Sequence, residues 1–270
     1  MTQQNKSIKF FSLSSSSCAN CFYLESGGCS ILIDAGVGIR SVERWLAERD
    51  IDIRSVSAIL LTHDHTDHVK AVGSLSKRYG FPIYATKATY TAVMDMSSLT
   101  TKPTADSVRY ITPGNSFKLG VFTIEAFRLP HDAADSVGYS IAVGDKNFAF
   151  LTDLGFLPLS VERYVREATH LIIESNYDEY MLAESSYPPS VQDRISGNNG
   201  HLSNLQAARY IAELYHPELE RVWLCHLSKE SNTPRCALDT TTRALQQAGI
   251  NMLKVVALPR TEPSDLYLIE

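Results

Sequence analysis

A histidine-rich segment follows an apolar run in the sequence "LLTHDHTDHV". It holds His63, His65, Asp67 and His68 within six residues. Imidazole and carboxylate groups are ligands that divalent zinc, manganese and iron accept. Such a dense group of ionisable side chains is unfavourable without a ligand, because like charges repel one another. The spacing therefore predicts a divalent metal centre, in which His63 and His65 enter one site and Asp67 and His68 enter a second site beside it.

Three further ligand-type residues follow apolar runs elsewhere in the chain. His131 ends "AFRLPH", Asp153 follows "FAFLT" and His226 follows "VWLC". Each has an ordinary alternative, such as a helix cap for Asp153 or a hydrogen-bonded buried histidine for His226. Polar groups that repeatedly arrive at the ends of apolar strands favour one shared crevice. Together with the first segment, they predict a two-metal centre.

Two more residues are candidates for catalysis. Glu174 ends the apolar run "LIIE", where an uncompensated carboxylate would be unfavourable. His201 precedes a helix that Ser203 can cap, with Gln206 as its capping-box partner. A helix N-terminus favours an anion, although a histidine beside a cap is also ordinary on a protein surface. Their roles depend on whether the fold brings them to the metal centre.

The elements that would position these residues alternate between strands and helices. Expected strands cover residues 29–36, 56–62, 82–86, 169–175, 221–227 and 266–270, with short strands and hairpins between 108 and 152. Expected helices cover residues 39–50 and 69–80, and others begin after Ser203 and after Thr233. Two sheets with helices on their outer faces fit this order better than a single doubly wound sheet.

Composition limits the function classes. The 270 residues are 44% hydrophobic with a net charge of −5 and no Lys/Arg run, which argues against a generic nucleic-acid-coating protein. The start lacks a signal-peptide pattern and no apolar run could span a bilayer, so we expect a cytoplasmic protein without a membrane partner. Five cysteines suggest no disulfide framework. Cys18 and Cys21, in "SLSSSSCANCFYLES", form a C-x-x-C that could be half of a zinc site or a redox pair. Because no second C-x-x-C exists, we interpret the segment as part of a serine-rich turn between two strands.

The histidine and aspartate motifs resemble the metallo-β-lactamase superfamily over nearly the whole chain. The resemblance implies an α/β fold, a four-layer αβ/βα sandwich of two mixed β-sheets flanked by helices, as one domain over residues 1–270 with two pseudo-symmetric halves. It also implies that Asp34, in "LIDAG", orients the site. The implied ligands are His63, His65 and His131 for the first cation, Asp67, His68 and His226 for the second, and Asp153 bridging both.

The resemblance implies a hydrolase with two divalent cations per chain, which could be zinc, manganese or iron because the ligand set contains no cysteine. Such a pair activates water as a nucleophile and stabilises charge on a departing oxygen. Asp67 would orient the water or take its proton. The bond that is hydrolysed does not follow from the metal ligands, since members of the superfamily cut lactams, thioesters, lactones and phosphodiesters.

Three short segments, "GHLSN", "SLSSSSCANC" and "HLSKESNTP", resemble the YycJ (WalJ) branch of this superfamily. That branch implies a DNA exonuclease that acts from the 5′ end, with Glu174 tuning a His201 that meets the scissile phosphate. The implied substrate contacts are His201, Ser203, Asn204, Ser228 and Asn232. Ser228 and Asn232 could instead hold their loop in shape. Tyr177, Tyr180 and Tyr187 could stack on bases or pack a surface loop.

Departures from other branches narrow this expectation. The chain shows no basic, glycine-rich arm like that of ribonuclease Z, and the segment between Glu174 and His201 is too short for a β-CASP domain. DNA is therefore favoured over RNA as the nucleic-acid substrate. One alternative is a hydrolase of cyclic or small phosphodiesters or, less well supported, of thioesters. Another is a metal-stabilised binding module without catalysis. The sequence leaves the native metal, strand polarity and oligomeric state open.

Overall fold

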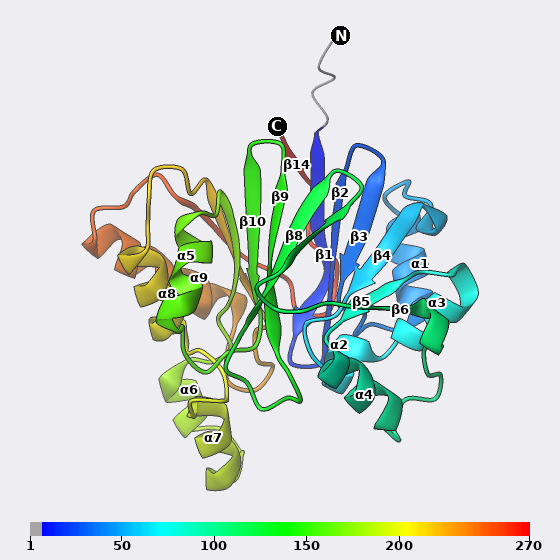
Figure 1. The fold of residues 1–270 in the computed structure, drawn as a ribbon. Coiled ribbons are helices and arrows are strands. Elements are labelled where there is room, and N and C mark those ends of the chain that lie inside the picture. The colour runs from blue at the N-terminus through cyan, green and yellow to red at the C-terminus, as the bar shows by residue number, and fades with distance from the viewer. Residues whose placement is uncertain (1–6) are drawn as a thin grey trace.

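The computed structural model describes residues 7–270 of the chain (Figure 1). Residues 1–6 lie outside the described residues. They belong to the segment from which we expected that the chain has no signal peptide. The strands are β1 (Ile8–Ser16), β2 (Ala19–Ser26), β3 (Cys29–Ile33), β4 (Val56–Leu60), β5 (Ile83–Ala85), β6 (Val108–Tyr110), β7 (Ser116–Leu119), β8 (Phe122–Arg128), β9 (Val137–Val143), β10 (Lys146–Leu151), β11 (His170–Glu174), β12 (Arg221–Cys225), β13 (Lys254–Ala257) and β14 (Tyr267–Ile269). The helices are α1 (Ile39–Ala47), α2 (Thr66–Val69), α3 (Val72–Tyr79), α4 (Lys87–Asp95), α5 (Leu159–Arg166), α6 (Glu179–Ala183), α7 (Pro189–Ser196), α8 (Asn204–Glu213) and α9 (Pro234–Gln247).

The strands form two seven-stranded mixed sheets. The first sheet has the order β14-β1-β2-β3-β4-β5-β6, and the second has the order β13-β12-β11-β10-β9-β8-β7. In the first sheet β1, β2 and β3 pair antiparallel and β3 to β6 pair parallel. The second sheet repeats this design, with β7 to β10 antiparallel and β10 to β13 parallel. The predicted pair of sheets is confirmed.

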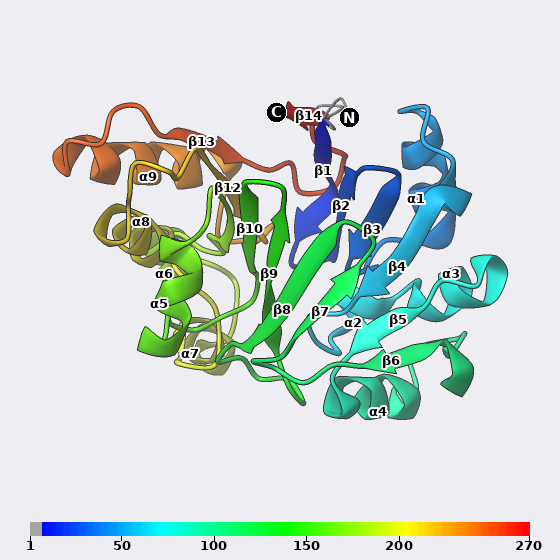
Figure 2. The ribbon, with the colours of Figure 1, turned by 45° about the horizontal axis from the view of Figure 1, so that its top comes forward.

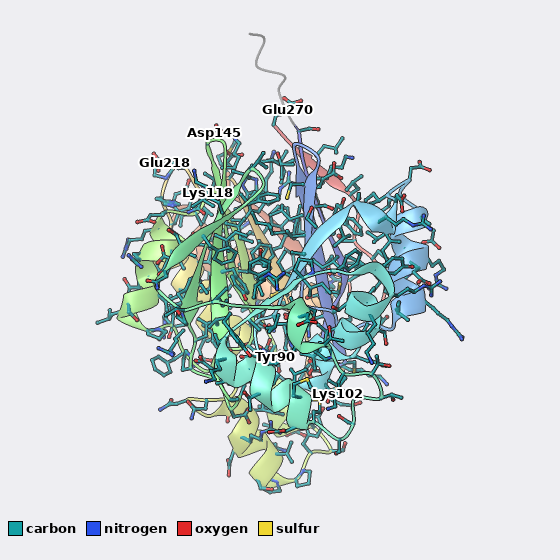
Figure 3. All side chains as sticks on the ribbon, turned by 45° about the vertical axis from the view of Figure 1, so that its right-hand side comes forward. Tyr90, Lys102, Lys118, Asp145, Glu218 and Glu270 are labelled. Atoms are coloured by element: carbon teal, nitrogen blue, oxygen red, sulfur yellow. The ribbon has the colours of Figure 1, made fainter. Side chains whose placement is uncertain are left out.

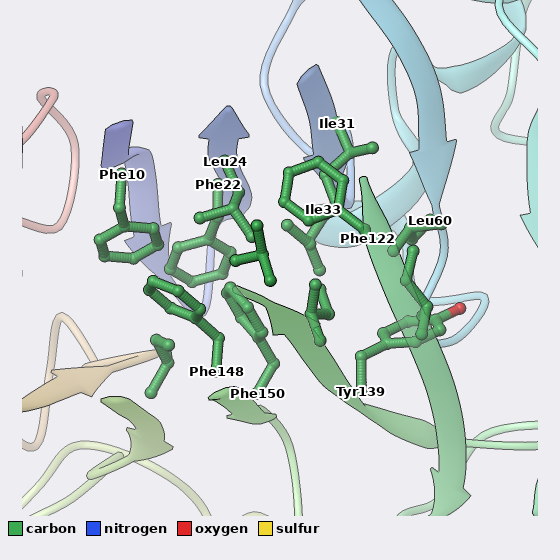
Figure 4. Close-up of a cluster of buried hydrophobic side chains, with 14 of the residues drawn as sticks. Phe10, Phe22, Leu24, Ile31, Ile33, Leu60, Phe122, Tyr139, Phe148 and Phe150 are labelled. Atoms are coloured by element: carbon green, nitrogen blue, oxygen red, sulfur yellow. The ribbon is translucent and has the colours of Figure 1, made fainter. Parts of the chain in front are cut away.

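The inner faces of the two sheets share an aromatic core. Phe10 and Phe22 of the first sheet contact Phe148 and Phe150 of the second (Figure 4). Phe10 also contacts Trp223 of the second sheet, with the two ring centroids 4.5 Å apart. All five side chains are buried. Aromatic side chains contribute large apolar areas, so this core fixes the position of one sheet against the other.

Helices cover the outer faces and complete the sandwich (Figure 2). Helices α1, α3 and α4 bury apolar side chains against the first sheet. Helices α5, α8 and α9 do the same against the second sheet. The four-layer αβ/βα architecture expected from the sequence is therefore confirmed. Within residues 7–270, the helices are all too short or too polar to traverse a bilayer.

Several local expectations need correction. The expected helix over residues 69–80 is two helices, α2 and α3, with Gly80 ending α3 in the left-handed conformation at φ +75°. The serine-rich segment is not a turn for most of its length, because β1 continues to Ser16 and β2 resumes at Ala19. Residues 10–16 are all buried, and small serine side chains fit a strand that is packed on both of its faces.

Both motif cysteines fit a structural role. Cys21 lies on β2 with a buried side chain, whereas Cys18 is exposed in the short turn before it. All five cysteines of the chain lie in the described part and are free thiols. The C-x-x-C segment therefore forms no disulfide in the structure.

The two ends of the sheets differ. Lys118, Asp145 and Glu218 lie at the end that carries the β2–β3, β7–β8 and β9–β10 turns, whereas Tyr90 and Lys102 lie toward the other end (Figure 3). Lys102 donates a hydrogen bond to the Val93 carbonyl of α4, 3.0 Å away, and so holds the end of that helix. Helices α2, α4, α6 and α7 gather at this second end (Figure 1). It is also where the candidate site lies.

Candidate metal centre and active site

The strand ends bring all seven predicted metal ligands together. His63, His65, Asp67 and His68 follow β4, and the other three follow β8, β10 and β12. Their ligand atoms form overlapping groups in which all atoms lie within 4.8 Å of one another. The groups are His63–His65–His131, His63–His68–Asp153 and Asp67–His68–His226. The first and third match the two expected ligand sets.

Asp153 lies between the two groups. Its Oδ1 is 3.1 Å from His226 Nε2 and 3.8 Å from His131 Nε2, and its Oδ2 is 3.2 Å from His68 Nε2. One carboxylate thus faces histidines from both expected sets. This position fits the bridging role implied for Asp153.

Hydrogen bonds outside the cluster orient its imidazoles. A carbonyl oxygen only accepts, so His65 Nε2 donates to the Asp132 carbonyl at 3.2 Å and His131 Nδ1 donates to the Gly200 carbonyl at 3.0 Å. The remaining nitrogens, His65 Nδ1 and His131 Nε2, face each other at 3.3 Å with lone pairs inward. Partners of this kind fix the tautomer of metal-binding histidines.

Asp34 has the contacts expected for the orienting role that the resemblance implies. It is fully buried, and its Oδ2 accepts a hydrogen bond from His68 Nδ1 at 2.7 Å. Thr62 donates to the same carboxylate through its backbone N–H at 2.9 Å and its hydroxyl at 2.8 Å. The Thr62 hydroxyl also lies 3.0 Å from His63 Nδ1. These contacts leave the Nε2 atoms of His63 and His68 directed at the cluster.

The donor set fits divalent cations. His63 Nε2 and Asp153 Oδ2 are buried without a hydrogen-bond partner, which is unfavourable unless another ligand satisfies them. Burial holds the pKa of His63 well below its ordinary value, so this imidazole is neutral. Burial opposes ionisation of Asp153, but His226, His68 and His63 hold its pKa well below the ordinary range. A neutral imidazole and an ionised carboxylate are the forms that bind metal.

The backbone at the site is strained. Asp34, Asp153 and His226 adopt left-handed φ values of +61°, +45° and +53°, which side chains other than glycine rarely adopt. Each follows a β-strand by one or two residues. Such conformations cost on the order of 1 kcal/mol and persist where the surrounding structure requires them, often at functional sites. Here they turn ligand-type side chains from the strand ends into the cluster.

Glu174 and His201 form a pair beside the cluster. His201 Nδ1 lies 2.6 Å from Glu174 Oε1, and Glu174 Oε2 accepts the backbone N–H groups of Leu154 and Leu202 at 3.1 and 3.0 Å. Burial lowers the pKa of His201, but the Glu174 carboxylate outweighs it and raises this pKa to about 9. The His201 ring stacks on His226 with centroids 5.2 Å apart. His201 is therefore a partly buried cation at the edge of the cluster.

The helix after His201 forms as predicted. Ser203 Oγ accepts the Gln206 N–H at 3.1 Å, and Gln206 Oε1 accepts the Ser203 N–H at 2.8 Å. This capping box starts α8 at Asn204, three residues beyond His201. The turn that ends at Gly200 and the start of α8 together hold His201 against Glu174.

A cavity of about 370 Å³ opens over the cluster. Of the expected site residues, His65, Asp67, Asp153, His201 and His226 line it. The other lining residues are Ser17, Thr66, Asp132, Arg194, Ile195 and Gly200. Candidate metal ligands and His201 thus face one space, which a small ligand or a strand end could enter.

Four expected substrate contacts lie elsewhere. Ser203, Asn204, Ser228 and Asn232 are buried and are not among the described residues lining the cavity. Asn204 Nδ2 donates to Asn232 Oδ1 at 3.0 Å, and Asn232 Nδ2 donates to the carbonyl of Ser175 at 2.8 Å. This geometry supports the alternative that the asparagines hold loops in shape. Direct substrate contact by these four residues stays a prediction without geometric support.

The three tyrosines near the cavity differ in exposure. Tyr177 is buried, Tyr187 is half-buried, and the Tyr180 side chain is exposed to 74%. They are not among the described residues that line the cavity. Only Tyr180 is open enough to offer a ring face, so base stacking also stays a prediction.

Sequence reasoning missed three residues at the site. Asn20 Nδ2 donates to Asp67 Oδ2 at 3.1 Å, Thr62 links Asp34 to two histidines, and Arg194 lines the cavity. Thr62 directly precedes His63, so its hydroxyl was a readable signal. Asn20 and Arg194 come from distant segments, and nothing local distinguishes them.

Comparison with known proteins identifies the class. Residues 30–227 match the model of the β-lactamase superfamily domain, and the chain belongs to this family. With its cluster of histidine and aspartate ligands, it is a metal-dependent hydrolase.

Two relatives match over most of their length. Exodeoxyribonuclease WalJ of Streptococcus pneumoniae is 33% identical over 245 residues, 91% of this chain and 91% of the relative. Exodeoxyribonuclease YycJ of Bacillus anthracis is 29% identical over 256 residues, 95% of this chain and 96% of the relative. The solved structure of the metallo-β-lactamase fold protein YhfI of Bacillus subtilis matches with a TM-score of 0.71 and 17% identity, over 97% of this chain and 99% of that chain, which shows the shared fold. The expected resemblance to the YycJ (WalJ) branch is confirmed.

Proposed function

We propose that this protein is a nuclease that hydrolyses DNA phosphodiester bonds from the 5′ end with two divalent cations, residues 1–270 forming one domain. The observation that carries the proposal is the Glu174–His201 pair, which lies against the candidate metal ligands and faces the same cavity. The names of the WalJ and YycJ relatives, exodeoxyribonucleases matched over more than nine-tenths of this chain, support DNA as the substrate.

In this proposal the cations occupy the two ligand groups. His63, His65 and His131 would hold one cation and Asp67, His68 and His226 the other, with Asp153 lying between the two groups. When bound, such a pair brings the pKa of water toward neutrality and stabilises negative charge on phosphate oxygens. Zinc, manganese and iron all suit a nitrogen and oxygen ligand set of this kind.

His201 serves as the cation that meets the substrate phosphate. With its pKa raised to about 9 it is protonated at neutral pH, and Glu174 occupies its Nδ1. Its other nitrogen, Nε2, then has an N–H to donate to a phosphate oxygen or to give as a proton to the departing oxygen. Two backbone N–H groups hold Glu174 in place, so the imidazole is oriented before substrate binds.

Asp67 serves as the acceptor of a hydrogen bond or a proton from the attacking water, whereas His201 serves as a donor. Burial raises the pKa of Asp67, but His68 outweighs this and lowers it below the ordinary value, so the carboxylate is ionised. Asn20 donates to Asp67 Oδ2 at 3.1 Å and fixes its orientation. An ionised and fixed carboxylate at the cavity wall can orient water or accept its proton.

The volume of the cavity also agrees with a second candidate, a hydrolase of small or cyclic phosphodiesters. The cavity of about 370 Å³ lies near the small end of the range for ligand pockets, roughly 300–1,000 Å³. A small diester would fit it whole, whereas only the end of a strand would enter. An exonuclease also needs room for one terminal nucleotide only, so both substrates agree with this volume.

The test uses metal-free protein reloaded with zinc or manganese. DNA and RNA strands labelled at either end, a cyclic dinucleotide and a thioester are incubated with it in parallel. The proposal expects DNA shortened stepwise from the 5′ end, with slower or no cleavage of RNA. Hydrolysis of the cyclic dinucleotide or the thioester without cleavage of DNA would refute it.

A further inference from the structure

Helix α7 carries a cationic side chain to the mouth of the cavity. Arg194 of this helix lines the cavity beside Ile195 and Gly200. Among the described residues that line it, Arg194 is the one with a Lys or Arg side chain. The other ionisable lining groups are candidate metal ligands, His201 and Asp132. Arg194 is therefore available for an anion other than the one at the cluster.

Tight packing holds this segment against the site. A Cβ at Gly200 would lie 2.2 Å from the carbonyl oxygens of Arg194 and Ile195, and one at Gly155 would lie 2.2 Å from that of Asn198. The Ile195 carbonyl accepts the His201 N–H at 2.8 Å, and the Gly200 carbonyl accepts His131 Nδ1. The end of α7 is thus fixed to both a candidate ligand and the catalytic pair.

Arg194 pairs across the cavity with Asp132. Its Nε lies 2.6 Å from Asp132 Oδ2, and the two side chains are exposed to 65% and 30%. Pairs this exposed contribute little to stability, so exchange of Asp132 for another anion is energetically accessible. A guanidinium also matches phosphate geometry with two parallel hydrogen bonds. Asp132 keeps Arg194 over the mouth until such an anion arrives.

We propose that Arg194 binds a phosphate of the nucleic-acid strand next to the one that is hydrolysed. The inference rests on the proposed function, in which the scissile phosphate lies at the metal ligands and His201. A cation at the mouth then has a partner only in a substrate with a second phosphate. Arg194 thereby makes the site prefer a polynucleotide to an isolated phosphodiester.

The test compares Arg194→Ala with a matched control, Arg78→Ala. Arg78 is exposed to 60% and pairs with Glu43 at 2.9 Å, but it lies on α3 and not in the cavity wall. The substrates are a single-stranded deoxyoligonucleotide and bis(p-nitrophenyl) phosphate, which has one phosphate. Arg194→Ala should raise KM for the oligonucleotide roughly tenfold, the usual effect of losing one charge-assisted hydrogen bond. Its kcat/KM for the single diester should stay within about twofold, and Arg78→Ala should match the wild type on both.

A binding measurement separates a phosphate contact from a structural effect. The Kd of a fluorescent phosphorothioate oligonucleotide, which resists hydrolysis, is measured by anisotropy at several salt concentrations. Loss of one phosphate contact should make the slope of log Kd against log salt shallower by about 0.7 in Arg194→Ala only. Arg194→Lys should retain most of the slope, because it keeps the charge.

The outcomes distinguish this inference from the proposed function. Equal effects of Arg194→Ala on both substrates, an unchanged KM, or an unchanged salt slope would overturn the role of Arg194 and leave a nuclease in place. Failure of the wild type to cleave any oligonucleotide, while it hydrolyses the single diester, would overturn both.

Discussion

The side chains around the cavity set one another's protonation. The Asp132 and Gly200 carbonyls take the outer N–H of His65 and His131, and the inner nitrogens of these two rings are left as lone pairs. Glu174 does the reverse for His201 by favouring its charged form. Lone pairs of His65 and His131 therefore face the metal position, and one imidazolium faces the substrate position. Metal binding and phosphate binding thus require different hydrogen-bond partners for the histidines, carbonyl groups in the first case and the Glu174 carboxylate in the second.

Replacing His201 should reduce catalysis without loss of metal. In His201→Asn the side-chain amide N–H lies near the position of Nδ1, so the Glu174 carboxylate keeps a hydrogen-bond donor. The variant lacks a group in the position of the second ring nitrogen, Nε2. We expect kcat to fall by about 10²- to 10⁴-fold, the range for a general acid. Metal content measured on the same preparation should match the wild type. A variant with normal kcat would remove His201 from the mechanism.

A histidine remote from the site predicts a pH dependence of stability. His170 is buried between Phe148 and Trp223, with ring centroids 4.8 and 5.6 Å away. Burial lowers its pKa from 6.5 to about 4. As the pH falls below 6.5 the unfolded chain binds a proton that the folded chain excludes, so stability is complete above 6.5 and is lost toward 4.

The measurement compares urea unfolding of the wild type and His170→Gln at pH 7.5 and pH 5. Between these two values the wild type should lose about 2 kcal/mol more of its free energy of unfolding than the variant. Taking the difference between variants removes the titration of other groups. Identical pH dependences would show that His170 is protonated as easily in the folded state.

At the scale of elements, strand ends and helix starts bring the functional groups into position. Strands β4, β10 and β12 end within three residues of a candidate ligand, and α8 begins three residues after His201. Short connections leave little freedom, so the side chains are oriented by the backbone of the elements themselves. The capping box of α8 is one of these connections.

Ser203→Ala tests whether Ser203 is a cap or a substrate contact. If Ser203 is a cap, Ser203→Ala should lower the free energy of unfolding by about 1 kcal/mol, whereas Ser203→Gly should lower it by only a few tenths of a kcal/mol. KM for the oligonucleotide should stay at the wild-type value in both variants. A raised KM with unchanged stability would instead support the substrate contact predicted from the sequence.

The sequence predicted elements with a strong local signal and missed those that tertiary contacts stabilise. The apolar runs before His63, Asp153 and His226 identified strands, because they are continuous and end in polar residues. Helix α4 escaped notice because its "KATYTAVMD" places threonines among scattered apolar residues, and the packing of Tyr90 and Val93 that stabilises it is tertiary. The Asn20–Asp67 contact joins positions 47 residues apart, so no local pattern contains it.

At the scale of the molecule, the metal centre lies where the two sheets meet. His63, His65, Asp67 and His68 follow a strand of the first sheet, whereas His131, Asp153 and His226 follow strands of the second. The aromatic core around Phe10 and Phe150 sets the distance between these groups. The sites therefore assemble only when the sheets pack, and bound cations should in turn stabilise the folded chain.

The most direct test of the central claim is the number of divalent ions that the folded protein retains. Wild type, Asp153→Asn and the control Asp145→Asn, an exposed carboxylate at a hairpin turn, are dialysed with zinc or manganese and analysed by mass spectrometry for metal. We predict about two ions per chain for the wild type and for Asp145→Asn, and loss of at least one in Asp153→Asn. A wild type that retains no metal above the buffer level, or an Asp153→Asn variant that retains as much as the wild type, would contradict the account.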